Sequence, residues 1–215
     1  MLLIINKYRL SLKIRVLFFM ELIKQNSQTQ ILKSLFVILM GSLVLTISAK
    51  IKIPFYPVPM TMQTLVVLFL GIAFGYKIGL ASVILYLFEG IIGLPVFSNS
   101  PEKGVGLIYF TGPTMGYLIG FLFAVFLIGK FRLHDWSKYN NKSYKFFFIN
   151  FIKLLISVSA IYFFGLLWLT YLIGLEKALL FGLKPFLLAE LFKMLILAFL
   201  IPIIFKLKNL SRRSF

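Results

Sequence analysis

The chain has few of the residues on which most enzyme chemistry depends. Its 215 residues include no cysteine, a single histidine (His134) and only 6 acidic side chains. The missing cysteines exclude a disulfide framework, a thiolate nucleophile and a zinc site built on sulfur. A single histidine excludes a His-rich metal site and any triad that needs a second imidazole. We therefore expect no catalytic residues, no metal and no cofactor, and a protein that is not an enzyme.

Charged residues are also scarce, whereas apolar residues are abundant. They make up 13% and 60% of the chain, against roughly 25% and 45–50% in average globular proteins. The mean hydropathy is +0.98, and a soluble domain of this length could not cover so large a core with so few polar residues. The sequence therefore predicts an integral membrane protein. Its formal charge of +17 then fits cytoplasmic loops and anionic lipid better than nucleic acid.

Six stretches are candidate membrane spans, since ~20 apolar residues cross a hydrocarbon core of ~30 Å. They cover residues 31–49, 61–75, 78–93, 114–130, 146–174 and 185–206. The second and third are short and are separated only by Gly75-Tyr76-Lys77, which predicts a tight helical hairpin. We therefore predict an all-α membrane protein, a compact bundle of six transmembrane helices.

Lysine and arginine set the orientation of these spans. With six spans, one side of the membrane carries 16 of these residues in its loops and tails, and the other side carries 5. Because basic loops stay in the cytoplasm, we predict that both termini are cytoplasmic. The chain then comprises a basic extension (1–30), a transmembrane domain (31–206) and a basic tail (207–215).

The first 30 residues are apolar and basic, but charged residues interrupt any continuous 18-residue run. We interpret this segment as an amphipathic helix on the inner membrane surface. A seventh span and a true start at Met20 remain alternatives. A signal peptide is disfavoured because no small-residue cleavage site follows.

The first outer loop is rich in proline and leads into polar residues. Pro54, Pro57 and Pro59 stiffen the backbone, and Thr61 and Gln63 begin the next span. One interpretation is a stiff turn with a helix cap. The other is a rigid wall whose amide and hydroxyl groups face a ligand.

Charged residues inside the predicted spans are rare enough to be informative. Glu190 and Lys193 are three residues apart in the last span and share a helix face. Such charges rarely face lipid, so we expect the pair to line a cavity, with an ion pair that merely joins helices as the alternative. In contrast, we expect Gly116 and Gly120, a G-x-x-x-G pair, to serve helix packing. Glu89 lies near the outer end of its span and either reaches water or has a function.

Four segments carry distinctive motifs. Residues 57–65 read P-V-P-M-T-M-Q-T-L, and residues 93–97 read G-L-P-V-F. Residues 112–121 read G-P-T-M-G-Y-L-I-G-F, and residues 185–193 read P-F-L-L-A-E-L-F-K. Together they resemble the BioY family, the biotin-specific substrate-binding (S) components of energy-coupling factor transporters, whose motifs are P-V-P-x-T-x-Q-T-L, G-L-P-V-F, G-P-T-x-G-Y-L-x-G-F and P-F-x-x-x-D-x-x-K. The last has glutamate here in place of the usual aspartate. The similarity covers about residues 31–206, with the motifs in the family's order.

This resemblance implies high-affinity capture of biotin on the outer side and its uptake as a multi-pass protein of the bacterial cytoplasmic (inner) membrane. An S component for another vitamin, such as thiamine or riboflavin, is the alternative. A membrane enzyme acting on lipid would need a nucleophile or a metal cluster, which this sequence lacks. A structural scaffold would not need proline-stiffened loops and charges inside the membrane.

The resemblance also implies roles for individual residues. Glu190 and Lys193 would contact the bicyclic ring of biotin, and Asn99 would hold its carboxylate, with Lys103 as a nearby cation. Lys193 can donate to the ureido carbonyl while Glu190 accepts from an N–H. The other predicted substrate-binding residues are Gln63, Thr61, Tyr86, Phe97 and Tyr117, with Trp168 as a further apolar wall.

Energy for transport must come from other proteins, because no G-x-x-x-x-G-K-[ST] phosphate-binding loop occurs. The resemblance implies a transmembrane coupling subunit and two ATPase subunits as partners, besides biotin and membrane lipid. Small residues of the first span would contact the coupling subunit. In this chain those residues are Gly41, Ser42 and Thr46, of which the last two form a small-x-x-x-small pair.

Overall fold

The computed structural model describes residues 28–53, 56–102, 104–131, 133–134 and 143–213. The predicted amphipathic segment lies almost entirely outside these residues, as do Met20 and Lys103. The chain divides into two compact units, Met1–Val37 and Ile38–Phe215. The first helix (Gln28–Lys50) spans their boundary, and the other described elements belong to the second unit.

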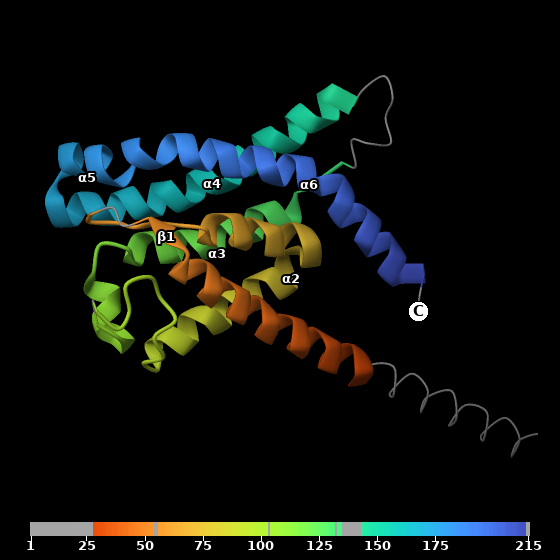
Figure 1. Cartoon of the computed structure of the whole chain (residues 1–215), viewed down its shortest axis with the longest axis horizontal. Coiled ribbons are helices and arrows are strands. Elements are labelled where there is room, and N and C mark those ends of the chain that lie inside the picture. Colours follow the sequence, from red (N-terminus) through yellow and green to blue (C-terminus); the bar gives the residue numbers. More distant parts are fainter. Residues whose placement is uncertain (1–27, 54–55, 103, 132, 135–142, 214–215) are drawn as a thin grey trace, which may run out of the picture. The chain divides into compact units, whose positions relative to one another are not determined.

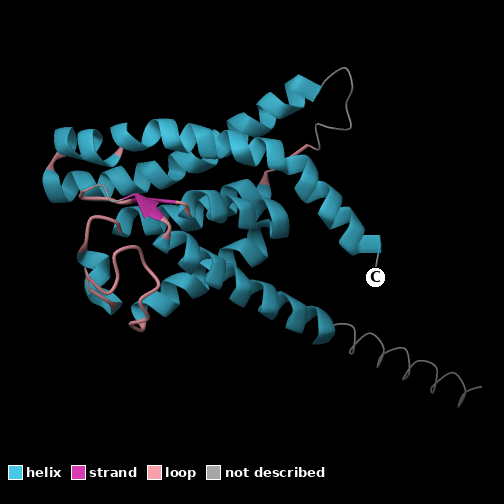
Figure 2. Ribbon diagram, in the orientation of Figure 1, coloured by secondary structure: helices cyan, strands magenta, loops and turns pink. Residues whose placement is uncertain are grey.

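Helices dominate the described residues, and four helical stretches are long and apolar enough to cross a membrane. These are the first helix (Gln28–Lys50), α2 (Gln63–Ile91), α4 (Ser143–Ile173) and the stretch Leu175–Leu207. A shorter apolar helix, α3 (Met115–Lys130), follows α2 in the sequence. Besides helices, Figure 2 shows loops and short strand structure among the described residues. The prediction of an all-α membrane protein is thus confirmed for the described part of the chain.

The helices are apolar on both their inner and outer faces. Leu68 and Leu197 are fully buried in the core, whereas Phe123, Phe163 and Phe199 expose about half of their surface. A helix that is apolar all round needs either a large protein core or lipid around it. The exposed aromatic residues therefore mark faces that meet the hydrocarbon of a membrane.

α2 is not one straight helix but two arms that fold back on each other at Gly75. Gly75 has φ 79° and ψ 174°, a backbone conformation restricted essentially to glycine. A Cβ added at Gly79 would lie 3.3 Å from the Cα of Gly71, whereas a straight helix would hold these residues ~12 Å apart. The hairpin predicted from Gly75-Tyr76-Lys77 is therefore confirmed.

Replacing Gly75 by alanine should destabilise the protein by about 1–3 kcal/mol, because the alanine would be held in a strained conformation. Crowding is not the cause, since no heavy atom lies within 4 Å of the position that the new Cβ would take. Thermal unfolding of the purified protein in detergent measures this effect. An unchanged unfolding temperature would contradict a turn that depends on glycine.

Two glycines allow α3 and α4 to approach closely. A Cβ added at Gly120 would lie 2.6 Å from the Cα of Ile161, and one added at Gly116 would overlap the carbonyl oxygen of Phe164. Both positions therefore require the absence of a side chain. The prediction that this G-x-x-x-G pair serves helix packing is confirmed.

The last span begins earlier than predicted, with a short helix that precedes the main one. Gly174 has φ 84° and ends α4. After it come α5 (Leu175–Gly182), the 3₁₀ helix η3 (Lys184–Phe186) and α6 (Leu187–Arg213). Figure 1 shows α5 and α6 returning beside α4. Glu176, Lys177 and Lys184 interrupt the apolar run here, which explains why hydropathy placed the start at Pro185.

Two loops connect the helix ends on the predicted outer side. In the first, β1 (Lys52–Ile53) pairs antiparallel with β2 (Met60–Thr61), and Lys52 lies opposite Thr61. The second runs from α2 to α3 through the 3₁₀ helix η1 (Gly106–Thr111). These two loops cover the ends of the helices that carry the candidate site.

Candidate functional site

The outer loops and parts of α2, α3, α4 and α6 line an open cavity. Its polar side chains come from β2, α2, the loop after α2, α3, α4 and α6. Six of the nine predicted substrate-binding residues line it, namely Thr61, Gln63, Tyr86, Phe97, Tyr117 and Glu190.

Glu190 and Lys193 form a buried ion pair on α6. The Nζ of Lys193 lies 2.8 Å from the Oε1 of Glu190, and the two side chains are only 5% and 7% exposed. Lys193 also donates to the carbonyl of Thr61 at 2.6 Å and to the Oγ1 of Thr64 at 3.1 Å. An ammonium group has three donor hydrogens, so each has an acceptor within the protein.

The second carboxylate oxygen of Glu190 is in a different situation. This Oε2 atom is buried and has no hydrogen-bond partner among the described residues. Leaving such an acceptor unpaired costs about 1–3 kcal/mol or more, and Glu190 lines the cavity. The structure therefore gives the two predicted residues different surroundings. Glu190 lines the cavity with one unpaired oxygen, whereas the ammonium of Lys193 has three acceptors within the protein.

Gln63 joins two walls of the cavity through its side-chain amide. Its Nε2 donates to the hydroxyl of Tyr86 at 2.7 Å, and its Oε1 accepts from the Oγ1 of Thr61 at 3.2 Å. The Tyr86 hydroxyl in turn lies 3.4 Å from the carbonyl of Val96. A primary amide has two donor hydrogens, so Gln63 has a second one to offer a ligand.

Phe97 forms an aromatic wall with three neighbouring rings. It stacks on Tyr109 at a centroid distance of 4.6 Å and meets Tyr86 and Phe110 edge-on at 5.3 and 5.4 Å. Tyr109 donates its hydroxyl hydrogen to the carbonyl of Ser98 at 2.5 Å. Burial raises the pKa of Tyr109, so this hydroxyl stays a neutral donor. Aromatic packing of this kind gives a well-ordered apolar surface.

Tyr117 lines the cavity as predicted. Trp168, which was predicted as a further apolar wall, is not among the described residues that line the cavity. The Tyr117 ring covers Gly165, and its hydroxyl donates to the carbonyl of Gly182 at 2.9 Å. Trp168 instead donates its indole N–H to the carbonyl of Gly112 at 2.9 Å. It therefore holds the segment that leads into α3.

The loop that follows Phe97 brings further polar groups to the cavity. Ser98 lines the cavity, and its buried Oγ has no partner among the residues that the structure describes. Its neighbour Asn99 accepts a hydrogen bond at 2.5 Å from Lys52. Lys103, the predicted cation, lies outside the described residues, whereas sequence analysis assigned no ligand role to Lys52.

Comparison with known proteins decides the family. The model of the BioY family matches residues 21–210, a range that contains every residue lining the cavity. The chain belongs to the BioY family.

Individual relatives agree with this membership. A probable biotin transporter BioY from Pyrococcus horikoshii is 30% identical over 148 residues, 69% of this chain and 81% of the relative. Another, from Rickettsia prowazekii, is 26% identical over 207 residues, 96% of this chain and all of the relative. A crystal structure described as the S-component for biotin from an ECF-type ABC transporter has a TM-score of 0.63 and 28% identity. That similarity covers 83% of this chain and 93% of the other.

Several cavity-lining residues of this BioY protein escaped sequence analysis. They include Ser98, Tyr109, Tyr162 and Phe186. Phe186 lies inside the recognised segment 185–193, and Tyr162 is a polar-tipped residue in the middle of an apolar span. Both signals were available in the sequence. Ser98 and Tyr109 lie in a loop whose path only the tertiary structure shows.

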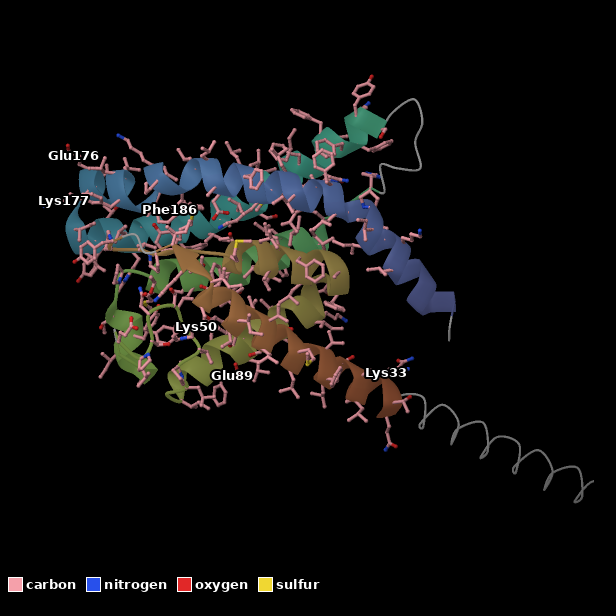
Figure 3. All side chains as sticks on the ribbon, in the orientation of Figure 1. Lys33, Lys50, Glu89, Glu176, Lys177 and Phe186 are labelled. Carbon is pink, nitrogen blue, oxygen red and sulfur yellow. The ribbon has the colours of Figure 1, made fainter. Side chains whose placement is uncertain are left out.

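The small residues that the BioY resemblance assigns to partner contact lie along the first helix. Ser42 is fully buried and donates to the Oε2 of Glu89, which Figure 3 labels on α2. A Cβ added at Gly41 would lie 2.6 Å from the Oγ of Ser82, so this position also faces α2. Thr46 is partly exposed, with its hydroxyl bonded to the Ser42 carbonyl at 3.1 Å. A partner contact through these residues stays a prediction.

Proposed function

We propose that the chain captures biotin with high affinity and serves its uptake across the cytoplasmic membrane as the substrate-binding subunit of an energy-coupling factor transporter. Its relatives are named biotin transporters, and the similar solved structure is described as an S-component for biotin. The observation that carries the proposal is the buried Glu190, which Lys193 holds with one oxygen unpaired beside the cavity. Such a site fits a ligand with an N–H donor and an apolar body.

The groups around the cavity match the chemistry of biotin. Its ureido ring has two N–H donors and a carbonyl acceptor, and its thioether ring and chain are apolar. In the proposed complex, Glu190 accepts from a ureido N–H, and Gln63 and Ser98 are the nearby donors for the carbonyl. Phe97 and Tyr117 flank the apolar part. Lys193 contributes by fixing the carboxylate, since its hydrogens are already bonded.

The proposed topology has six membrane-crossing segments, with both termini in the cytoplasm. The two arms of α2 count separately because the chain reverses at Gly75. α3 has 16 residues, or ~24 Å, somewhat less than a hydrocarbon core of ~30 Å. The 16-to-5 distribution of basic residues supports cytoplasmic termini.

Coupling to ATP hydrolysis is assigned to a transmembrane coupling subunit and two ATPase subunits. Support comes from the solved relative, which is described as part of an ECF-type ABC transporter. The first helix, with Gly41, Ser42 and Thr46, is the proposed contact with the coupling subunit. Of these three residues, Thr46 is the one that is partly exposed.

A ligand screen with the purified protein tests the proposed substrate. We expect biotin and desthiobiotin to bind with submicromolar Kd in calorimetry, because both carry the ureido ring that meets Glu190. Thiamine and riboflavin should neither bind nor compete. Tight binding of either of them, in a protein that ignores biotin, would overturn the proposed substrate and favour an S component for another vitamin.

A further inference from the structure

Two lysines hold the segment 97–100, here called the rim loop, which borders the cavity. The Nζ of Lys50, at the end of the first helix, lies 2.8 Å from the carbonyl of Phe97 and 2.9 and 3.3 Å from the carbonyl and hydroxyl of Ser100. Lys52, in β1, donates to the Oδ1 of Asn99 at 2.5 Å. Figure 3 shows Lys50 beside this loop and Phe186 on the α5–α6 side.

The two ammonium groups differ in what they can still offer. Each has three donor hydrogens. Lys50 has acceptors for all three within the rim loop, so it supports the loop and has no donor left. For Lys52, Asn99 is the hydrogen-bond acceptor that the described residues supply. Lys52 therefore retains donors for a further acceptor.

The contact with Lys52 also fixes the orientation of the Asn99 side chain. An ammonium group can only donate, so the amide oxygen of Asn99 must face it and the NH₂ group must point elsewhere. The backbone of Asn99 has φ 63°, a left-handed conformation that asparagine adopts more readily than most residues. The rim loop thus presents an oriented amide donor next to a cation.

Both residues are adjacent to the cavity wall. Asn99 directly follows Ser98, and Lys52 lies opposite Thr61 in the strand pair; Ser98 and Thr61 both line the cavity. Directly opposed residues of an antiparallel pair project their side chains from the same face. Lys52 therefore projects from the same face as Thr61. An ammonium and an amide N–H in this position suit an anionic group.

We propose that Lys52 is a specificity-determining residue, which recognises the carboxylate of the ligand beside Asn99, the residue that the BioY resemblance already assigns to this group. This inference rests on the proposed function. The arrangement of donors and acceptors supports it, because the unpaired oxygen of Glu190 can only accept a hydrogen bond and has no donor to offer a carboxylate. The acidic end of the ligand is thereby directed to the rim loop. Biotinamide, in which a neutral amide replaces the carboxylate, lacks the negative charge. Lys52 should therefore not recognise it.

Calorimetric Kd values for biotin and biotinamide, measured with the full-length protein, test the proposal. The unaltered protein should prefer biotin by at least about tenfold. Lys52→Met should remove that preference, because it should weaken the binding of biotin and leave the binding of biotinamide unchanged. Asn99→Asp keeps an acceptor for Lys52 but places a negative charge beside the ligand. Asn99→Asp should therefore weaken the binding of biotin by at least about tenfold, whereas the Kd for biotinamide should change little.

Two matched lysine variants separate recognition from loop support. Lys50→Met should weaken both ligands to the same degree, because it removes a support of the rim loop. Lys177→Met removes an exposed lysine of α5 and should change neither Kd. The inference is overturned if Lys52→Met or Asn99→Asp keeps the original ratio of Kd values. A protein that binds biotin and biotinamide equally also overturns it, whereas one that binds neither overturns the proposed function.

Discussion

Lys193→Met is expected to weaken biotin binding at least about tenfold, a loss of about 1.5–3 kcal/mol. Methionine keeps much of the apolar stem but lacks the ammonium that donates to Glu190 and to Thr61 and Thr64. Glu190 is then a buried carboxylate without its counter-ion. Breaking such a pair costs about 3–5 kcal/mol of folding stability. Calorimetry with biotin and thermal unfolding in detergent measure the two effects.

A double variant separates the two effects of Lys193. Adding Glu190→Gln to Lys193→Met removes the uncompensated charge, so most of the lost stability should return. Biotin binding should not return, because the oriented carboxylate is gone. Lys184→Met, at an exposed lysine before α6, is the matched control and should behave as the parent. A Lys193→Met protein that binds biotin as tightly as the parent would show that the cavity is not the biotin site.

Gly90→Ala should weaken biotin binding at least about tenfold and lower stability by about 1–3 kcal/mol. A Cβ at this position would overlap the ring of Phe97. That ring lines the cavity and is packed between Tyr86, Tyr109 and Phe110. With neighbours on those sides, the displaced ring must enter the ligand space. Alanine is otherwise the better helix former by ~1 kcal/mol, so helix propensity alone predicts the opposite sign.

A second change tests this mechanism. Combining Gly90→Ala with Phe97→Leu removes the ring atoms that the new methyl group meets, so affinity should recover relative to Gly90→Ala alone. Gly112→Ala is the matched control, since its backbone is extended and its Cβ would meet only the carbonyl of Tyr109, at 3.2 Å. If Gly90→Ala stabilised the protein and left the Kd unchanged, the aromatic wall would not border the ligand.

The helices could be predicted because a membrane imposes a simple condition on the sequence. Each span must be apolar over most of its length, and interruptions such as Gly75 therefore stand out. The turn at Gly75 and the close contact through Gly116 and Gly120 were both predictable, because glycine alone satisfies those positions. Hydropathy failed at α5, where Glu176 and Lys177 hide a helix that still belongs to the last span.

The candidate site was predictable to the extent that polar residues are costly inside a membrane. Glu190, Gln63 and Thr61 stood out for this reason, and the structure places all three on the cavity wall. The division of roles between Glu190 and Lys193 was not predictable. It depends on the carbonyl of Thr61, which a loop distant in sequence brings to the ammonium group.

The sequence by itself determined that this chain is a helical membrane protein, where its helices lie apart from α5, and which family its outer motifs resemble. These properties follow from the cost of burying polar groups and from glycine positions, which act locally along the chain. Only the tertiary structure decided that Lys52 meets Asn99 and that Ser42 turns toward Glu89. Each of these contacts joins residues 47 positions apart. Their physical cause is the packing of whole helices and loops, which no local pattern encodes.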